Sequence, residues 1–302
     1  MLLLEALTHT QGFSDGHSAI AAWLVEHRNE AHAMTTKQIA RATFTSPAAV
    51  VRLAQKLGYE GFDDLRRELA RESVYLNQNF RGVDANQPLS AGDSMMTVAA
   101  KVSALARETA ADTLSLMDEA TLARAVELME RARAIHVAAV SFPLLYAQDF
   151  QLKMRRIGKP VLAVTVPGEQ LFAEQLATPE DCALVVSYSG TTPATLDLAR
   201  MYQRCGVPII AVTSMGTNPL RELADTTLTL TTRERLYSKV AGFTSEVSIK
   251  LTLDTLYACY FSRHLDEYQH MKDEVSSHAE PGRTSDSAIL REEDDAEESA
   301  PA

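Results

Sequence analysis

Cysteine is scarce in this chain of 302 residues, which holds three. Cys182, Cys205 and Cys259 lie far apart, without the paired spacing of a zinc site or a disulfide framework, so we expect no metal and a reducing, cytoplasmic location. No apolar run approaches the roughly 20 residues that cross a bilayer as a helix. The start, MLLLEALTHTQGF, lacks the basic region and the small-residue cleavage site of a signal peptide. We therefore expect neither secretion nor contact with a membrane.

The net charge does not indicate what class of molecule the protein binds, because acidic residues are concentrated at one end of the chain. The formal net charge is -11, and residues 273–302 hold ten Asp or Glu against Arg283 and Arg291. The preceding 272 residues therefore carry a net charge of only -3. Since a terminal acidic run need not face any partner, the total does not exclude a nucleic-acid-binding protein. The length and the 46% of apolar residues predict two ordinary folded domains.

Changes in composition divide the chain into four parts. Short amphipathic helices are expected in residues 1–78, and the segment 79–92, NFRGVDANQPLSAG, has the Asn, Gly, Pro and Ser of a linker. Residues 93–270 form the second predicted domain. The last part, 271–302, is Ser-rich and acidic, so we expect it to be disordered.

The second domain alternates short apolar runs with amphipathic segments, which is typical of a parallel sheet covered by helices on both faces. Pro143 and Pro193 can each begin a helix between strands, and Gly158 and Gly206 can end them. A last helix over 244–264 has so little polar surface that we expect it to be buried between layers or between subunits. The expected strands are IHVAAV at 135–140, VLAVTV at 161–166, CALVVS at 182–187, PIIAVT at 208–213 and TTLTLT at 226–231.

Residues 36–57 predict two short helices joined by a tight turn, the pattern of a helix-turn-helix. Thr36 is expected to cap the first helix, a turn of three residues follows, and Ser46 with Pro47 starts the second helix. Four basic residues and no acidic one lie from Lys37 to Lys56, which suits phosphate oxygens. An ordinary packed helix pair is the alternative. The predicted DNA-facing residues, with Arg52 foremost, are Lys37, Ser46, Pro47, Ala48, Ala49, Arg52, Gln55 and Lys56.

A second candidate site follows the third expected strand, where CALVVSYSGTT leads from apolar residues into small and hydroxyl-bearing ones. Backbone N–H groups at a helix N-terminus and nearby hydroxyl donors together suit a phosphate. The chain has neither the lysine of a nucleotide P-loop nor a GxGxxG motif, so no nucleotide or other cofactor is expected. A turn that binds nothing is the alternative. The expected ligand-binding residues here are Ser187, Ser189, Gly190, Thr191 and Thr192.

The string SPAAVVRLAQKLGYEGFDDL at 46–65 closely resembles the N-terminal DNA-binding domain of RpiR-type bacterial transcriptional regulators. The stretch from Ser187 to Thr192 resembles the sugar-isomerase (SIS) domain, the phosphosugar-binding domain that usually follows that helix-turn-helix. Together the two resemblances cover about residues 20–265. They imply an all-α helix-turn-helix domain followed by an α/β, three-layer SIS domain with a parallel sheet. They also imply two partners, a double-stranded DNA operator and a phosphorylated sugar.

The loop after the first expected strand departs from the family pattern. Where the family has a Gly-rich loop that ends in Ser, this chain has AVSFP at 139–143. Pro143 takes the place of that Ser and cannot donate a hydrogen bond. Either Ser141 substitutes for it or the ligand contact is lost. Glu246, at the start of the last helix, is a further candidate ligand-binding residue whose alternative role is capping.

Residues suited to binding are better represented than residues suited to chemistry. An isomerase needs a positioned base and a second proton carrier, and the candidates are Glu169, Glu174, Glu246 and His136, of which His136 is expected to be a core residue. We therefore predict a regulator of sugar or amino-sugar metabolism, not an enzyme, that binds DNA as a homodimer or tetramer and responds to a phosphosugar. The main alternative is a sugar-phosphate isomerase or lyase with an accessory helical domain, and a third is a scaffold that binds no sugar.

Overall fold

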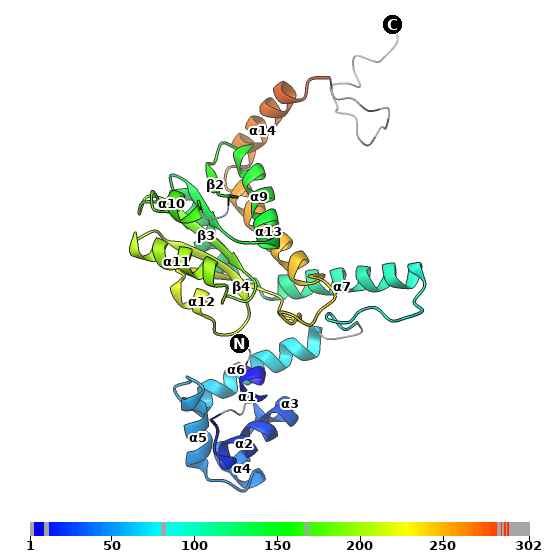
Figure 1. Ribbon diagram of the computed structural model, residues 1–302, viewed down its shortest axis with the longest axis vertical. Helices are drawn as coiled ribbons and strands as arrows, with labels where there is room; N and C mark the ends of the chain where they lie inside the picture. Colours follow the sequence, from blue (N-terminus) through cyan, green and yellow to red (C-terminus); the bar gives the residue numbers. More distant parts are fainter. Residues whose placement is uncertain are drawn as a thin grey trace.

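The computed structural model begins with a group of short helices and continues into a sheet covered by helices (Figure 1). The structure describes residues 3–8, 12–79, 83–166, 169–282 and the single positions 285, 287 and 289. The long helices α6 (Phe62–Asn79) and α7 (Met95–Ser115) lie between the two parts. Among the helices that the structure describes, none is long and apolar enough to span a bilayer.

The helical part packs around one apolar core. Besides α6, it consists of α1 (Leu3–Thr8), α2 (Asp15–Glu26), α3 (Arg28–Ala31), α4 (Thr36–Ala42) and α5 (Pro47–Lys56). Ile20 and Leu24 of α2, Ile39 of α4, and Val50 and Leu53 of α5 are each at most 1% exposed. Their spacing puts the apolar side chains of each helix on one face, and burial of these faces stabilises the group.

The two helices joined by the tight turn begin at side-chain caps. Thr35, and not Thr36 as predicted, caps α4: its hydroxyl accepts a hydrogen bond from the Gln38 N–H at 3.3 Å, and the Gln38 side chain accepts one from the Thr35 N–H at 2.8 Å. The cap lies one residue earlier because this reciprocal capping box needs Gln or Glu three residues after the cap. Ser46 caps α5 as predicted, accepting from the Ala49 N–H at 3.2 Å.

Five parallel strands form the sheet, in the order β2-β1-β3-β4-β5. They are β1 (Ile135–Ala138), β2 (Val161–Ala163), β3 (Cys182–Ser187), β4 (Ile209–Ser214) and β5 (Thr226–Leu230). β1, β3 and β4 are buried along their whole length, which explains their unbroken apolar sequences. β1 and β2 end sooner than the apolar runs predicted, because the chain leaves the sheet after Ala138 and Ala163.

Helices cover both faces of the sheet, which confirms the predicted three-layer α/β architecture behind an all-α first part. Val137 and Leu184 point to one face, and Ala183 and Val185 point to the other. The first face carries α8 (Glu119–Arg131), α9 (Phe142–Arg155) and α13 (Ser245–Ser262); the second carries α10 (Gln170–Glu174), α11 (Pro193–Arg204) and α12 (Pro219–Leu223). Helix α13 is thus buried between layers of one chain, packed against α7, α8, α9 and β5.

A further helix, α14 (Leu265–Ala279), follows α13 and corrects the predicted extent of disorder. Residues 271–279 were expected to be disordered, yet they continue this helix. The Tyr268 ring stacks on Tyr260 of α13, with ring centres 5.7 Å apart, and Gln269 donates a hydrogen bond to Asp273 one turn later at 2.9 Å. Most of the remaining tail, including the acidic run 292–298, lies outside the described residues.

Candidate DNA-binding and phosphate-binding sites

The second helix of the helix-turn-helix, α5, turns a polar face to solvent. Val50 and Leu53 are buried beneath it. The expected exposed position of Ala49 is wrong, because this residue lies one turn before Leu53 on the buried face and is only 9% exposed. The other predicted DNA-facing residues are all exposed: Lys37, Ser46, Pro47, Ala48, Arg52, Gln55 and Lys56.

Residues from before and within α2 join this face. The Lys56 ammonium donates a hydrogen bond to the Gly12 carbonyl and lies 5.5 Å from the centre of the Phe13 ring. The pKa of His17 is lowered by burial and by the positive charges of Lys56 and Arg52. These contacts place His17 and Phe13 beside the predicted DNA-facing residues. Sequence analysis missed His17 and Phe13 because they are distant from α5 in the chain.

Hydroxyl groups converge where β3 ends and α11 begins. The hydroxyl oxygens of Ser187 and Thr192 are 3.1 Å apart, and the Ser189 hydroxyl accepts hydrogen bonds from the N–H and the hydroxyl of Thr191 at 3.2 and 3.0 Å. First-turn N–H groups of an α-helix have no carbonyl within the helix to bind, and the positive end of the helix dipole lies beside them. This segment, Ser187–Thr192, which we call the phosphate loop, therefore offers the donors that an anion requires.

Gly190 sets the shape of the phosphate loop. Its φ of +65° is one that L side chains rarely adopt, and a Cβ at this position would lie 2.1 Å from Asn218 Oδ1. Asn218 caps α12 by accepting from the Arg221 N–H at 3.1 Å, and the Gly190 carbonyl accepts from the Leu220 N–H at 3.2 Å. Only glycine fits here, and the loop is held against the start of α12.

The phosphate loop lies where the sheet changes its direction of winding. β1 and β3 are neighbours, and the chain passes from β1 to β2 on one side and from β3 to β4 on the other. In open parallel sheets a ligand crevice forms at this point, outside the carboxyl ends of the strands. Ser141 follows β1 at the same edge and begins α9, so the structure brings Ser141 and the phosphate loop to neighbouring strand ends.

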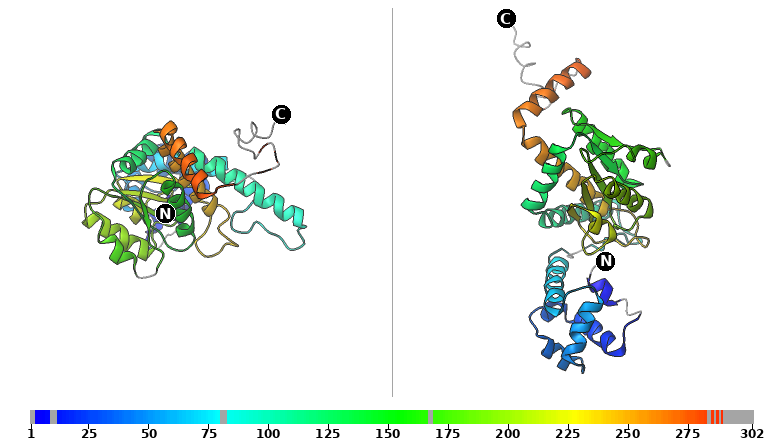
Figure 2. Two further views of the ribbon diagram at one scale, coloured as in Figure 1. Left: turned by 90° about the horizontal axis from the view of Figure 1, so that it is seen from above. Right: turned by 90° about the vertical axis from the view of Figure 1, so that its left-hand side faces the viewer.

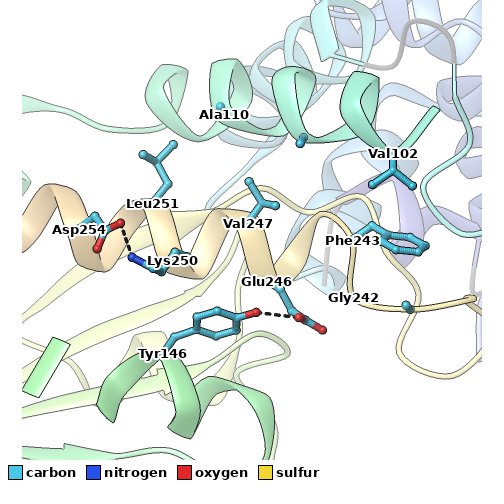
Figure 3. Close-up of a pocket in the computed structure, with 12 residues that line it drawn as sticks. Val102, Ala110, Tyr146, Gly242, Phe243, Glu246, Val247, Lys250, Leu251 and Asp254 are labelled. Atoms are coloured by element: carbon cyan, nitrogen blue, oxygen red, sulfur yellow. Dashed lines mark hydrogen bonds and ion pairs between the residues drawn. The ribbon is translucent and has the colours of Figure 1, made fainter. Parts of the chain in front are cut away.

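Glu246 lines a cavity between three helices of the second part. The Tyr146 hydroxyl donates a hydrogen bond to Glu246 Oε2 at 2.7 Å, and both side chains line a cavity of about 490 Å³ between α7, α9 and α13 (Figure 3). Val102 and Val247 form part of its apolar wall. Among the described residues that line it, none comes from the phosphate loop. This cavity therefore holds Glu246 without the other predicted ligand-binding residues.

Comparison with known families accounts for both parts of the chain. Residues 1–74 match the helix-turn-helix domain of the rpiR family, and residues 128–259 match the SIS domain. The helix-turn-helix belongs to the rpiR family. This RpiR-family protein thus joins a DNA-binding helix-turn-helix to a SIS domain, as the sequence predicted.

Solved structures share this architecture in whole or in part. The NanR protein of Vibrio vulnificus, complexed with ManNAc-6P, is 25% identical with a TM-score of 0.59, and the match covers 94% of this chain and 100% of NanR. The sugar isomerase domain of an RpiR transcription factor from Sphaerobacter thermophilus is 22% identical (TM-score 0.53, 59% of this chain and 98% of that one). A putative sugar-phosphate isomerase from Listeria monocytogenes is 19% identical (TM-score 0.51, 63% and 100%). The last two show the fold alone.

His136 of this RpiR-family protein lies near the amino end of its strand, whereas the phosphate loop follows the carboxyl end of the neighbouring strand β3. It is buried near the start of β1, with Nε2 3.7 Å from Asp181 Oδ2, and Arg133 donates to the same carboxylate at 3.0 Å. Burial alone would raise the pKa of Asp181, but hydrogen bonds from Arg133 and Thr178 lower it to about 2. His136 is therefore a partnered core residue, as predicted. Glu169 is exposed, and the Glu174 side chain lies outside the described residues.

The loop between β5 and α13, residues 231–244, contributes contacts that sequence analysis missed. The Tyr188 hydroxyl, from the phosphate loop, donates to the Glu234 carbonyl at 3.1 Å and accepts from the Glu234 N–H at 3.0 Å. The Glu234 carboxylate accepts from the Ser245 N–H at 3.2 Å and from Lys239 Nζ at 2.8 Å, and so caps α13. This loop therefore connects the phosphate loop to the N-terminus of α13.

Asn86, in the segment predicted to be a linker, is bound to the same loop. Its Oδ1 accepts from the Arg235 N–H at 2.7 Å, its Nδ2 donates to the Arg233 carbonyl at 3.3 Å, and its own carbonyl accepts from the Val240 N–H at 3.0 Å. Asp84 accepts from the Asn86 N–H at 2.8 Å. The described part of the linker is therefore fixed to the SIS domain shortly before α7.

Proposed function

We propose that this RpiR-family protein is a transcriptional regulator that binds an operator through α5 and changes its affinity for DNA when a phosphorylated sugar binds the SIS domain. One observation carries the proposal. A single chain joins an exposed recognition helix, in a segment with basic but no acidic residues, to a phosphate loop at the switch point of a parallel sheet. The first feature suits DNA and the second suits a small phosphorylated ligand.

On the DNA side, the exposed residues of α5 enter the major groove. Arg52 is placed for a guanine edge or a phosphate, and Gln55 for a base edge. A homodimer or tetramer presents two such helices to half-sites about 34 Å apart, one helical turn of DNA. The first turn of α7 extends beyond the sheet with Met95 and Met96 at 85% and 77% exposure, which supports contact with a second subunit (Figure 2).

On the ligand side, the phosphate group binds the hydroxyls of the phosphate loop and the N-terminus of α11, with Ser141 across the crevice. The comparison with NanR supports this class of ligand, since that protein is complexed with ManNAc-6P, an amino-sugar phosphate. Hydroxyl and backbone N–H donors without a cationic side chain favour a compact phosphate monoester over a nucleotide.

The hydrogen bonds of the loop 231–244 provide a physical connection between the two sites. Ligand bound at the phosphate loop acts on Tyr188, which binds the Glu234 backbone, and the neighbouring backbone of Arg233 and Arg235 binds Asn86. Asn86 precedes α7 and follows α6, the last helix of the DNA-binding part. A ligand that favours one arrangement of this loop therefore favours one placement of the DNA-binding helices.

The first experiment measures binding to double-stranded DNA from upstream of the protein's own gene, at fixed salt, with a panel of phosphosugars. We expect tight binding that one sugar phosphate alters. Arg52→Ala should raise the dissociation constant at least tenfold, whereas the control Arg200→Ala, at an exposed arginine of α11, should leave it unchanged. Absence of specific binding by the folded wild type at several salt concentrations would contradict the proposal.

Two further variants separate ligand binding from its transmission. Ser189→Ala should weaken the response to the sugar phosphate while leaving DNA affinity intact. Asn86→Ala should retain both affinities measured separately, yet lose the effect of one ligand on the other. Gln87→Ala, at the exposed neighbour, is the matched control. Equal loss of both affinities in a folded Ser189→Ala protein would contradict separate sites.

An isomerase or lyase is the second candidate, and the Tyr146–Glu246 pair is the observation that favours it. Burial and the hydrogen bond to Glu246 raise the pKa of Tyr146 to about 12, which gives one cavity a proton donor and an acceptor. The phosphate loop does not line that cavity within the described residues, so we propose binding without turnover. Turnover of a phosphosugar that Glu246→Gln abolishes would overturn this choice.

A further inference from the structure

Phe44, in the turn between α4 and α5, is held in an unusual state. Its side chain is 98% exposed, and its φ is +52°. Among the described residues, only Phe44 and Ser141 combine a positive φ with a side chain. A bulky residue in the left-handed region is uncommon, and a fully exposed aromatic ring gains nothing from burial. Neither feature stabilises the folded chain by itself.

Hydrogen bonds of the turn impose this state. The Thr45 N–H donates to the Ala40 carbonyl at 2.8 Å, and the Phe44 N–H donates to the Arg41 carbonyl at 3.4 Å. The Thr43 hydroxyl donates to the Ile39 carbonyl at 2.9 Å. These bonds close the C-terminus of α4 with Phe44, the residue after its C-cap Thr43, in the left-handed conformation, a position usually taken by glycine or asparagine. The ring of Phe44 is thereby directed away from the core.

The turn places this ring at the DNA-facing end of the molecule. Phe44 comes two residues before Ser46, the cap of α5, and three residues after the exposed Arg41. The α4–α5 turn lies at the end of the molecule farthest from the sheet (Figure 1). In helix-turn-helix proteins the N-terminal residues of the second helix contact base edges, so a side chain just before that helix is adjacent to the groove.

We propose that Phe44 is a DNA-contact residue whose ring packs on a thymine C5-methyl group and the adjoining sugar at the edge of the operator half-site. This inference rests on the proposed DNA-binding function. Duplex DNA offers an apolar surface in the major groove only at thymine methyl groups, and phenylalanine is suited to contact them. Because the ring carries no charge, its contact adds preference for sequence without neutralising a phosphate.

The test compares Phe44→Gly with the wild type for stability and for operator binding. Glycine adopts a positive φ without strain, so the variant should melt at the same temperature or a few degrees higher. Its operator affinity should nevertheless fall about tenfold, with an unchanged slope of log K against log salt concentration. Arg52→Ala is the contrasting variant, which should lower both affinity and slope. Phe44→Leu, which keeps an apolar side chain, should retain part of the affinity.

Operators in which single thymines are replaced by deoxyuracil locate the contact, because this exchange removes only the methyl group. The wild type should lose affinity at one position in each half-site, and Phe44→Gly should be insensitive there. Equal sensitivity of both proteins, or unchanged affinity of Phe44→Gly where Arg52→Ala fails to bind, would overturn the role of Phe44 and leave the regulator intact. A change in oligomeric state with Phe44→Gly, measured by sedimentation, would assign the ring to a subunit contact instead. Failure of the wild type to bind any operator would overturn the proposed function itself.

Discussion

Ser141 occupies a backbone conformation that normally requires glycine. Its φ is 59° and its ψ is -139°. Relief of this strain is worth about 1 kcal/mol, so we expect Ser141→Gly to raise the free energy of unfolding by that amount. Ser141→Ala keeps the strain and removes only the hydroxyl, so it should leave stability unchanged. Urea denaturation of the three proteins measures the difference, and equal stability of the Gly and Ala variants would show that no strain is stored here.

The same two variants test the ligand contact proposed for the loop after β1. If the Ser141 hydroxyl binds the phosphosugar across the crevice, both variants lose affinity by a similar factor, although only Ser141→Gly relieves the strain. Calorimetric titration with the active sugar phosphate provides the measurement. Unchanged affinity in both variants would mean that this loop has lost the contact that the family's serine makes.

Asp112, on α7, is an ionisable group in the interior of the protein. It is 1% exposed, and within the described part of the chain neither of its carboxylate oxygens has a hydrogen-bond partner. Burial is the main cause that raises its pKa from 3.8 to about 7. The negative charge of Glu108 also raises this pKa, and the positive charge of Arg233 lowers it. The unfolded chain therefore releases this proton near pH 3.8, whereas the folded chain keeps it to about pH 7.

Stability consequently falls as the pH rises between these two values, by up to about 1.4 kcal/mol per pH unit from this group. Asp112→Asn cannot ionise, so its free energy of unfolding relative to the wild type should increase from about pH 4 to about pH 7 and then stay constant. Denaturant titrations at about pH 4.5 and about pH 7.5 give the two differences. The same difference at both values would contradict a raised pKa.

Single positions show most clearly what the sequence did and did not reveal about the sites. The hydroxyl residues of the phosphate loop and the exposed Arg52 were predictable because their roles depend on neighbours in the sequence. Ala49 was misplaced because a small residue is compatible with either face of a helix. Asn86 and His17 gave no signal, since their contacts join segments far apart in the chain, and only the fold brings these together.

At the scale of elements, helix α13 depends on a cap from outside its own sequence. The Glu234 carboxylate accepts hydrogen bonds from the Thr244 and Ser245 N–H groups and from Lys239. Although burial raises the pKa of Glu234, the hydrogen bonds from Lys239, Ser245 and Thr244 lower it more, to a net value below its ordinary 4.5. A negative charge at this end also interacts favourably with the helix dipole.

We expect Glu234→Gln to lower the free energy of unfolding by about 2 kcal/mol at neutral pH, because it removes a charge that buried donors require. A lowered pKa stabilises the fold above the unfolded pKa, so the advantage of the wild type should disappear as the pH falls below 4.5. Glu222→Gln, at an exposed glutamate of α12, is the control and should have little effect. A Glu234→Gln protein as stable as the wild type would show that the cap is dispensable.

Elements with regular periodicity were predictable, and their ends were less so. Every expected strand is present, because a parallel sheet covered on both faces demands unbroken apolar runs. The apolar runs extend past the ends of β1 and β2, where Ala139 still packs in the core without pairing in the sheet and Val166 is exposed. Helix α14 was missed because the acidic composition of the tail outweighed a helical segment whose Tyr268 ring packs on Tyr260 and Phe261 of α13.

At the scale of the whole molecule, the tail is acidic, whereas the helix-turn-helix segment from Lys37 to Lys56 holds only basic charges. Residues 283–302 hold seven acidic and two basic residues. We expect deletion of 283–302 to leave the melting temperature and the operator affinity unchanged, because α14 and its stack on α13 remain. Deletion from residue 265 onward, which removes α14, should lower the melting temperature. Tighter DNA binding after the shorter deletion would show instead that the tail repels DNA.

The two-part architecture was predictable from the whole chain, because each part has its own periodicity and each resembles a known family. The relation between the parts was not, since nothing in the segment 79–92 distinguishes a free tether from a fixed one. Three hydrogen bonds made by Asn86 decide that question in favour of a fixed attachment.

That attachment determines where such proteins can be recombined. A chimera that gives this SIS domain the DNA-binding part of another RpiR-family protein should be joined between Asn79 and Val83, so that Asn86 stays with the loop it binds. A junction at residue 92 would look equally natural from composition, yet it would import a foreign residue in place of Asn86. The first chimera should bind the other protein's operator with an affinity that this protein's effector changes. The second chimera should bind that operator and this effector, but neither should change the affinity for the other.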